Sequence, residues 1–268
     1  MKELTGYSTT NGFPIYSFEH VKQHRLQFRK SHNDYIAQQG GQENTLKANA
    51  EKQLREARAL FQKALERAMK PKEGWEIKSL GEIATDMYRG SGIKRDQVTK
   101  EGTPCVRYGE IYTTYNLSFD TCVSHTKEEY ISSPKYFEHG DLLFAITGES
   151  VEDIGKTIAY MGKEICLCGG DIICMKHKQN PKFLAYALST PDAIRQKGIG
   201  KTKLKVVHTN APALKAITIP IPSLTEQQHI VARLDSLSSN LRKLEEIEHK
   251  VIAECDALKQ ALLRKVFE

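Results

Sequence analysis

The amino-acid sequence predicts an α+β protein: one mixed, β-rich domain flanked by two long helices that form an antiparallel coiled coil or helical bundle. Residues 72–222 contain short runs of β-branched and aromatic residues separated by glycine pairs, a composition typical of sheets. The segments on either side repeat apolar residues every three or four positions, as amphipathic helices do. Prolines stand at both changes of pattern, where a helix is expected to stop or start.

The first long helix is predicted upstream of the sheet segment. Residues 1–41 mix polar and aromatic residues without clean periodicity and end in Gln-Gln-Gly-Gly, which predicts a partly ordered lead-in. Apolar residues then recur in a stripe made of Ala50, Leu54, Ala57, Phe61, Ala64 and Ala68. This stripe, and Pro71 as its stop, predict a helix over residues 42–71 that approaches another helix closely.

Residues 72–223 are predicted to form one domain of about 150 residues. Its strands are expected in the runs TPCVRYGEIYTTY (103–115), GDLLFAIT (140–147), KTIAYMGKEICLC (156–168) and DIICMKH (171–177). One helix is expected over residues 180–198, ending at Gly198. Pro220 and Pro222 lack a backbone N–H, so they favour the end of an edge strand. They also prevent the helix that follows from extending toward the N-terminus through them.

The second long helix is predicted over residues 224–268. Ser223 offers an N-cap oxygen and Glu226 completes a capping box. Thr225 and Gln228 offer the same pair two residues later, so either pair can form the cap. With Leu234 as heptad position a, eight of the ten a and d sites are apolar, and so long a seam needs another helix to cover it. The alternative is a surface helix packed on its own domain.

The predicted contacts of the two helices, with each other or with a second copy, fall on the apolar seam. They are Leu54, Phe61, Leu234, Leu237, Leu241, Leu244, Val251, Leu258 and Leu262.

The composition is that of a soluble globular protein. The chain has 268 residues, of which 40% are hydrophobic and 27% charged. It contains no apolar run of about 18 residues and no signal-peptide core. Its six cysteines follow no secreted framework, so we expect a cytoplasmic protein. The net charge of +6 permits an anionic partner without establishing one.

Four stretches stand in a distinctive order along the chain. They are GWEIKSLGEIA (74–84), GDLLFAITGESVEDIGKTIA (140–159), NPKFLAYALST (180–190) and GKTKLKVVHTNAPALKAITIPIPSLTEQQHIVARLD (200–235). In these stretches the chain resembles the specificity subunit of type I restriction–modification systems. The resemblance covers about residues 72–268, and the last stretch, with its proline pair and Glu-Gln-x-x-Ile, is the most specific.

The resemblance implies a DNA-recognition subunit that directs methyltransferase and restriction subunits to a bipartite target. Members of that family normally carry two target recognition domains separated by two helical spacers, and this chain has room for one domain. The resemblance therefore implies a half-length subunit, with residues 72–223 as the target recognition domain. The implied partners are double-stranded DNA, methyltransferase subunits, a restriction subunit within the complex, and a second copy of the chain in a homodimer.

The segment IRQKGIGKTKLKVVH (194–208) is the strongest electrostatic feature. Arg195, Lys197, Lys201, Lys203 and Lys205 come within eleven residues without an acid among them, and Gly198 and Gly200 leave the backbone open. On charge alone, a solvated basic loop is equally plausible. The resemblance at Gly200, Lys201, Thr202 and Lys203 favours DNA contact, mainly with phosphates.

Two further segments are candidate DNA contacts. In CVRYGEIYTTYN (105–116), Arg107 can read guanine bidentately, and Tyr108, Tyr112 and Tyr115 can contact sugars or bases. A strand with core tyrosines is an equally good interpretation of that segment. The segment RGSGIKRDQ (89–97) places Arg89, Lys94 and Arg95 around two glycines.

Signatures of catalysis are not found in the sequence. The chain lacks the G-x-x-x-x-G-K-[ST] phosphate loop and an Asn-Pro-Pro-Tyr-type methyltransferase motif. Cys166 and Cys168 are spaced too closely for a typical zinc pair. We therefore expect neither enzymatic activity nor a metal or other cofactor. The alternative function is a helical interaction scaffold whose β domain does not read DNA; an independent nuclease is a third candidate.

Overall fold

The computed structural model describes residues 8–10, 13–15, 18–148, 150, 153–200 and 207–267. It has two compact units. The helical unit contains Met1–Arg58 and Asn240–Glu268, and the sheet unit contains Ala59–Ser239. Both long helices, α1 (Phe18–Ala68) and α7 (Leu224–Phe267), contribute to both units. No helix among the described residues is long and apolar enough to cross a membrane.

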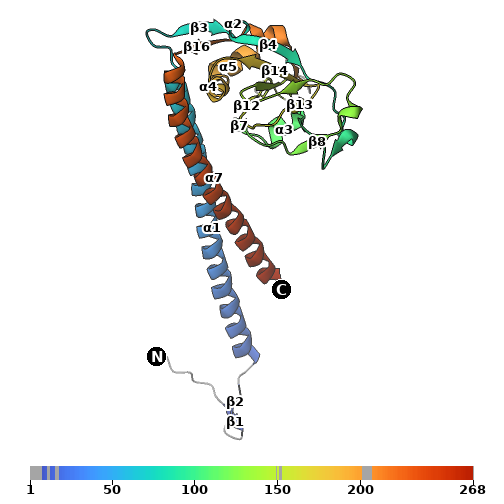
Figure 1. The fold of residues 1–268 in the computed structure, drawn as a ribbon. Helices are drawn as coiled ribbons and strands as arrows, with labels where there is room; N and C mark the ends of the chain where they lie inside the picture. Colours follow the sequence, from blue (N-terminus) through green and yellow to red (C-terminus); the bar gives the residue numbers. More distant parts are fainter. Residues whose placement is uncertain are drawn as a thin grey trace. The chain divides into compact units, whose positions relative to one another are not determined.

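In the helical unit, α1 and α7 pair in antiparallel fashion, as predicted (Figure 1). Lys47 forms an ion pair with Asp256, whereas Arg58, further along α1, pairs with Glu245, which comes earlier in α7. As the residue number increases along α1, the number of its partner on α7 decreases, so the two helices run in opposite directions. Among the residues of this unit whose side chains the structure describes, the buried ones are Glu43, Ala50, Leu54, Glu248 and Cys255.

The predicted helix start at residue 42 is wrong, because α1 begins at Phe18. Residues 18–41 lack a clean apolar stripe, but they are rich in good helix formers such as Lys, Arg, Gln and Leu. The Gly40–Gly41 pair costs about 1 kcal/mol per glycine, which is too little to end a helix with favourable neighbours. Upstream lies a short hairpin of β1 (Ser8–Thr10) and β2 (Phe13–Ile15).

The sheet unit is built on two five-stranded sheets. The first has the order β4 (Ala84–Arg89), β14 (Ile172–His177), β10 (Leu142–Ala145), β12 (Thr157–Tyr160) and β7 (Ser118–Phe119). The second has the order β5 (Val98–Thr99), β8 (Ser124–Thr126), β6 (Thr103–Val106), β13 (Cys166–Cys168) and β9 (Tyr136–Phe137). Two smaller pairs are β11 (Thr147–Gly148) with β15 (Val207–His208), and β3 (Glu76–Ser79) with β16 (Thr218–Ile221).

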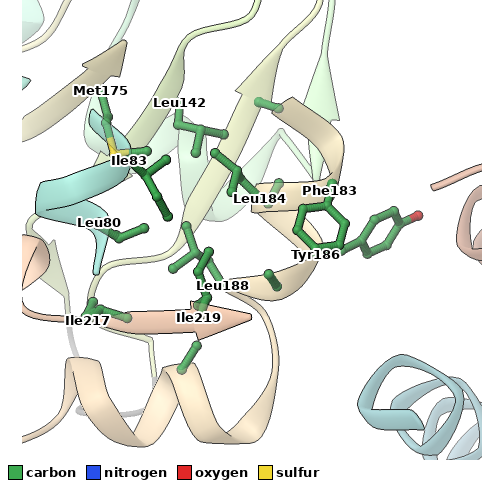
Figure 2. Packing of buried hydrophobic residues seen from close by; sticks show 14 of the residues in the cluster. Leu80, Ile83, Leu142, Met175, Phe183, Leu184, Tyr186, Leu188, Ile217 and Ile219 are labelled. Atoms are coloured by element: carbon green, nitrogen blue, oxygen red, sulfur yellow. The ribbon is translucent and has the colours of Figure 1, made fainter. Parts of the chain in front are cut away.

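Both faces of the first sheet are covered, which explains its continuous apolar strands. Leu142 and Phe144 of β10 pack in one buried cluster, while Leu143 and Ala145 pack in another on the opposite face. Figure 2 shows the first cluster, where Leu80, Phe183 and Ile219 converge from different elements. Burying each large apolar side chain of this kind contributes about 2 kcal/mol to stability.

Short helices complete the sheet unit. They are α2 (Leu80–Ile83), α3 (Tyr108–Thr113), α4 (Pro181–Ala187), α5 (Pro191–Lys197) and α6 (Ala211–Lys215), with 3₁₀ turns at η1 (Arg95–Gln97) and η2 (Glu128–Tyr130).

Two predictions about these helices were wrong. Residues 180–198 form two helices instead of one, because Pro191 cannot donate to a preceding turn and Thr190 caps a new helix through Ala193 N (3.3 Å). The segment 103–115 is a strand only to Val106, since α3 begins at Tyr108. The predicted end at Gly198 is confirmed, because Gly198 is the C-cap of α5.

The junction between β16 and α7 follows the sequence closely. Among the described residues β16 pairs only with β3, so it is an edge strand. Ser223 Oγ accepts a hydrogen bond from Glu226 N (3.3 Å), and α7 starts at Leu224. In the part of the chain that the structure describes, the predicted return bond from Glu226 is not found; its carboxylate accepts hydrogen bonds from Trp75 Nε1 (2.9 Å) and Lys72 Nζ (3.1 Å).

Candidate nucleic-acid interface

One groove in the sheet unit collects candidates from two predicted loops. Its volume is about 860 Å³, and we call it the arginine groove. Its lining includes Arg89, Arg95, Arg107, Tyr108, Gly169 and Gly170, together with the acids Glu110 and Asp171. The sequence had placed Arg89 and Arg95 in one segment and Arg107 and Tyr108 in another, and the fold brings the two segments to one concave surface.

Close backbone packing forms the floor of the arginine groove. Gly169 N donates to Val106 O (2.9 Å), and Gly169 also bridges to Ser91 in parallel fashion. A Cβ on Gly169 would lie 2.6 Å from Val106 O, and one on Gly90 would lie 2.2 Å from Gly169 O. These glycines therefore let the ends of β4, β6 and β13 meet, and this sets Arg89 and Arg107 around one floor.

Arg107 stands at the start of α3 and is held by a buried acid. Its Nε donates to Glu110 Oε1 (3.2 Å), and its backbone N donates to Glu110 Oε2 (3.1 Å). Glu110 is itself buried and accepts a third hydrogen bond from Ser124 Oγ (2.7 Å). The guanidinium is therefore oriented before any ligand arrives.

The other basic side chains of this region are more exposed. Arg89 Nη2 contacts Asp171 Oδ1 (2.6 Å), and Arg89 Nε donates to Gly170 O. Arg95 is exposed, and Lys94 lines a smaller adjoining pocket that shares Arg89 with the groove. The combination of three arginines and an adjoining lysine suits a phosphate or a base edge.

The predicted tyrosines divide between surface and interior. Tyr108 is 41% exposed at the rim of the groove. Tyr112 is partly buried, and its hydroxyl donates to Asp153 O (3.2 Å). Burial raises the pKa of Tyr115 and Tyr112 above the ordinary value for tyrosine. Only Tyr108 is therefore placed to contact a ligand in the groove.

The predicted basic segment after α5 is described only in part. Lys201, Thr202, Lys203 and Lys205 lie outside the described residues. Gly200 is exposed with φ +72°, a conformation that glycine adopts without strain. At the end of the segment, His208 Nδ1 contacts Thr147 Oγ1 (3.1 Å), which anchors this end to β11.

Lys197 is not a surface contact, and this prediction was wrong. It is 5% exposed, and its Nζ donates to Thr157 Oγ1 (3.1 Å) and Leu188 O (2.8 Å). Burial lowers the pKa of Lys197 to about 7. The reason is helical phase: Lys197 lies on the inner face of α5, whereas Arg195 is exposed, paired with Asp192, and lines a different pocket from the arginine groove.

The predicted helix contacts also divide. Phe61 of α1 and Leu234 of α7 pack in one hydrophobic cluster of the sheet unit, where the Phe61 ring lies 6.5 Å from the Tyr186 ring. Leu54 is buried within the helical unit. Leu241, Leu244, Val251 and Leu262 are partly buried, whereas Leu237 and Leu258 are exposed by 37% and 47%.

Sequence reasoning missed the acids that hold the arginines. An Arg-x-x-Glu pattern at a helix start could have revealed Glu110, because a capping glutamate is expected at the third helical position. No local pattern could have revealed Asp171, which reaches Arg89 from the turn before β14. Among the described residues, no three His, Cys, Asp or Glu side chains are placed to hold a metal ion.

A family model and a relative that match the amino-acid sequence of this chain both describe specificity proteins of type I restriction systems. A model of the family described as "Type I restriction modification DNA specificity domain" matches residues 72–252, more than half of the chain. A protein of Methanocaldococcus jannaschii, named as the MjaX specificity subunit of a type I restriction enzyme, is 30% identical over 211 residues. That match covers 73% of this chain and 47% of the relative, so the chain spans about half the relative's length.

Solved structures share the fold. The HsdS subunit of Thermoanaerobacter tengcongensis matches with a TM-score of 0.55 and 20% identity, over 89% of this chain and 57% of that chain. A chain from a structure of the type I R-M system matches with a TM-score of 0.64 and 20% identity, over 94% and 60% of the two chains. With the matching family model, these similarities establish that the chain belongs to the family of type I restriction–modification DNA specificity domains.

Proposed function

We propose that this chain is the DNA sequence-recognition subunit of a type I restriction–modification complex. It reads one half of a bipartite target and leaves methyl transfer and cleavage to the methyltransferase and restriction subunits. The arginine groove carries this proposal, because it gathers Arg89, Arg95 and Arg107 on one concave surface. Such a complex would act on DNA in the cytoplasm.

The chemistry of the groove fits double-stranded DNA. Arginine pairs bidentately with the O6 and N7 atoms of guanine in the major groove, and exposed cations bind phosphates without regard to sequence. Arg107 supplies an oriented guanidinium, and Arg95 and Lys94 supply exposed charge. The basic segment 201–205 adds further phosphate contacts.

The helices support the proposal of a half-length subunit that works as a homodimer. In the helical unit, Leu46, Ile247, Leu258 and Leu263 are each at least 47% exposed although apolar. A second copy would cover these side chains and would supply the second reading domain for a two-fold, interrupted target. The same helices would dock the methyltransferase subunits.

Salt-dependent DNA binding tests the proposal. The apparent affinity for duplex DNA should fall as salt rises, and Arg95→Ala should make the slope of log affinity against log salt shallower by about 0.9, the value expected for one lost phosphate contact. Lys163→Ala, which removes an exposed lysine outside the groove, should leave the slope unchanged. A wild-type chain that binds no duplex even at low salt would favour the interaction scaffold instead.

A further inference from the structure

We propose that Glu110 is a positioning residue that makes Arg107 a reader of guanine, so that the Arg107–Glu110 pair sets base preference while Arg89 mainly adds affinity. This inference rests on the proposed function, in which the arginine groove receives DNA.

Glu110 is fixed from several directions. Its residue is only 7% exposed, and each carboxylate oxygen has a donor from the protein. Oε1 accepts from Ser124 Oγ on β8 (2.7 Å) and from Arg107 Nε (3.2 Å), and Oε2 accepts from Arg107 N (3.1 Å). A carboxylate with three donors in a buried setting has a single preferred orientation, and it imposes that orientation on the guanidinium.

The bond to Nε leaves the useful end of Arg107 free. Among the described residues, the two terminal nitrogens of its guanidinium form no hydrogen bond, and the residue lines the groove. These two nitrogens can donate together to guanine O6 and N7. Because the guanidinium is planar and its Nε is held by Glu110, the direction of both donors is defined in advance.

Arg89 is held differently. Its Nε donates to Gly170 O, and its Nη2 is bonded to Asp171 Oδ1 (2.6 Å), so one of its terminal nitrogens is already occupied. The two side chains are 63% and 40% exposed, compared with 31% and 9% for Arg107 and Glu110. Exposed ion pairs are weak and screened by salt, so Asp171 constrains Arg89 much less.

Charge gives the inference a distinctive signature. The Arg107–Glu110 pair is neutral as a unit, so it adds little to the attraction of phosphates, and its value lies in direction. Glu110→Gln keeps the side-chain volume and removes one negative charge. It should therefore leave affinity for a random duplex unchanged or slightly higher, while affinity for the preferred duplex falls. Structural damage would lower both.

The test begins with selection of a preferred half-site from randomised duplexes by the full-length wild-type chain. Dissociation constants for that duplex and for a scrambled one are then measured at fixed salt. Arg107→Lys and Glu110→Gln should each lower the ratio of the two affinities by about tenfold or more, the range expected for one bidentate pair. Glu129→Gln, at an exposed carboxylate paired only loosely with Lys127, is the matched control and should not change the ratio.

Two further arms isolate the contact. Replacing the guanines of the preferred site one at a time by 7-deazaguanine removes the N7 acceptor, and one such replacement should weaken wild-type binding about tenfold but leave Glu110→Gln binding unaffected. Asp171→Asn should change the ratio less than Glu110→Gln does. The double variant of Arg107→Lys and Glu110→Gln should be no less selective than Arg107→Lys alone, because both changes remove one contact.

The outcomes separate the two proposals. If wild type selects no duplex, the proposed function fails, and this inference fails with it. If wild type selects a site but neither Arg107→Lys nor Glu110→Gln lowers the affinity ratio, the inference is overturned while DNA recognition stands. If Glu110→Gln does not fold, as judged by circular dichroism, Ser124→Ala removes one donor to the carboxylate, and an unchanged ratio in both Ser124→Ala and Arg107→Lys overturns the inference.

Discussion

Lys197 illustrates how burial changes the role of a charged residue. Its amine contacts a threonine hydroxyl and a backbone carbonyl, and among the described residues no acid neutralises it. Desolvation alone lowers its pKa to about 7, against about 10.4 for a solvated lysine. Between these two values the unfolded chain carries the proton and the folded chain does not, so folding becomes more favourable as pH rises.

We expect Lys197→Met to remove this pH dependence. The free energy of unfolding of the wild type, minus that of the variant, should rise by about 1.4 kcal/mol per pH unit between about pH 7.5 and 9.5. Urea denaturation at three pH values measures the difference, which also cancels the opposing effect of buried thiols such as Cys105, whose pKa burial raises to about 12. Lys163→Met, at an exposed site, is the control. A difference that stays flat with pH would show that Lys197 is charged in the folded chain.

At the scale of elements, the first turn of α7 is fixed by side chains of the Glu-Gln-x-x-Ile motif. Gln227 is fully buried, and its Nε2 donates to Gln179 Oε1 (2.7 Å) and Pro222 O (2.9 Å). Its Oε1 accepts from Asn180 N (2.9 Å), next to the start of α4. Ile230, one turn later, joins the hydrophobic core. The motif therefore attaches the long helix to the sheet unit.

Gln227→Ala should destabilise the sheet unit by about 3 kcal/mol, because it leaves buried donors and acceptors without partners. Gln228→Ala changes the exposed neighbour on the same turn and should alter the free energy of unfolding by less than about 0.5 kcal/mol. Chemical denaturation of both variants measures the contrast. Equal effects at the two positions would mean that the hydrogen bonds of Gln227 do not anchor the helix.

At the scale of the whole molecule, the central question is what covers the apolar side of the helices. The heptad a sites Glu248 and Cys255 are buried within the single chain, whereas the d site Leu258 is 47% exposed. Pairing of α1 with α7 thus buries a sites of the seam and leaves the d site Leu258 exposed to solvent. The proposed homodimer would cover this remaining surface and would also supply the second half-site reader of the proposed function.

Light scattering should give twice the mass of one chain at micromolar concentration, and a complex with two methyltransferase subunits when these are added. Leu258→Lys should shift the mass toward a single chain, because it buries an unpaired charge in the proposed interface. Leu224→Lys, at a similarly exposed leucine outside the a and d sites, should leave the mass unchanged. A wild-type chain that is monomeric and recruits no methyltransferase would contradict the homodimer.

The sequence by itself determined the kinds of elements and several of their limits. The apolar periodicity predicted both long helices, Pro220 predicted the edge strand, and Ser223 predicted the start of α7. These features depend on contacts within a few residues, so a local pattern carries them. The order of the four motif stretches was also enough to identify the family.

Only the tertiary structure decided which charged residues act together. Arg89 and Arg107 share a groove because the ends of three strands meet at glycines that are distant in sequence. Asp171, directly before β14, pairs with Arg89 at the same place. Lys197 turned inward although its neighbour Arg195 faces solvent. In a short helix such as α5, the local pattern only weakly determines which face is buried. Long-range packing selects that face, and this selection distinguishes a DNA contact from a core residue.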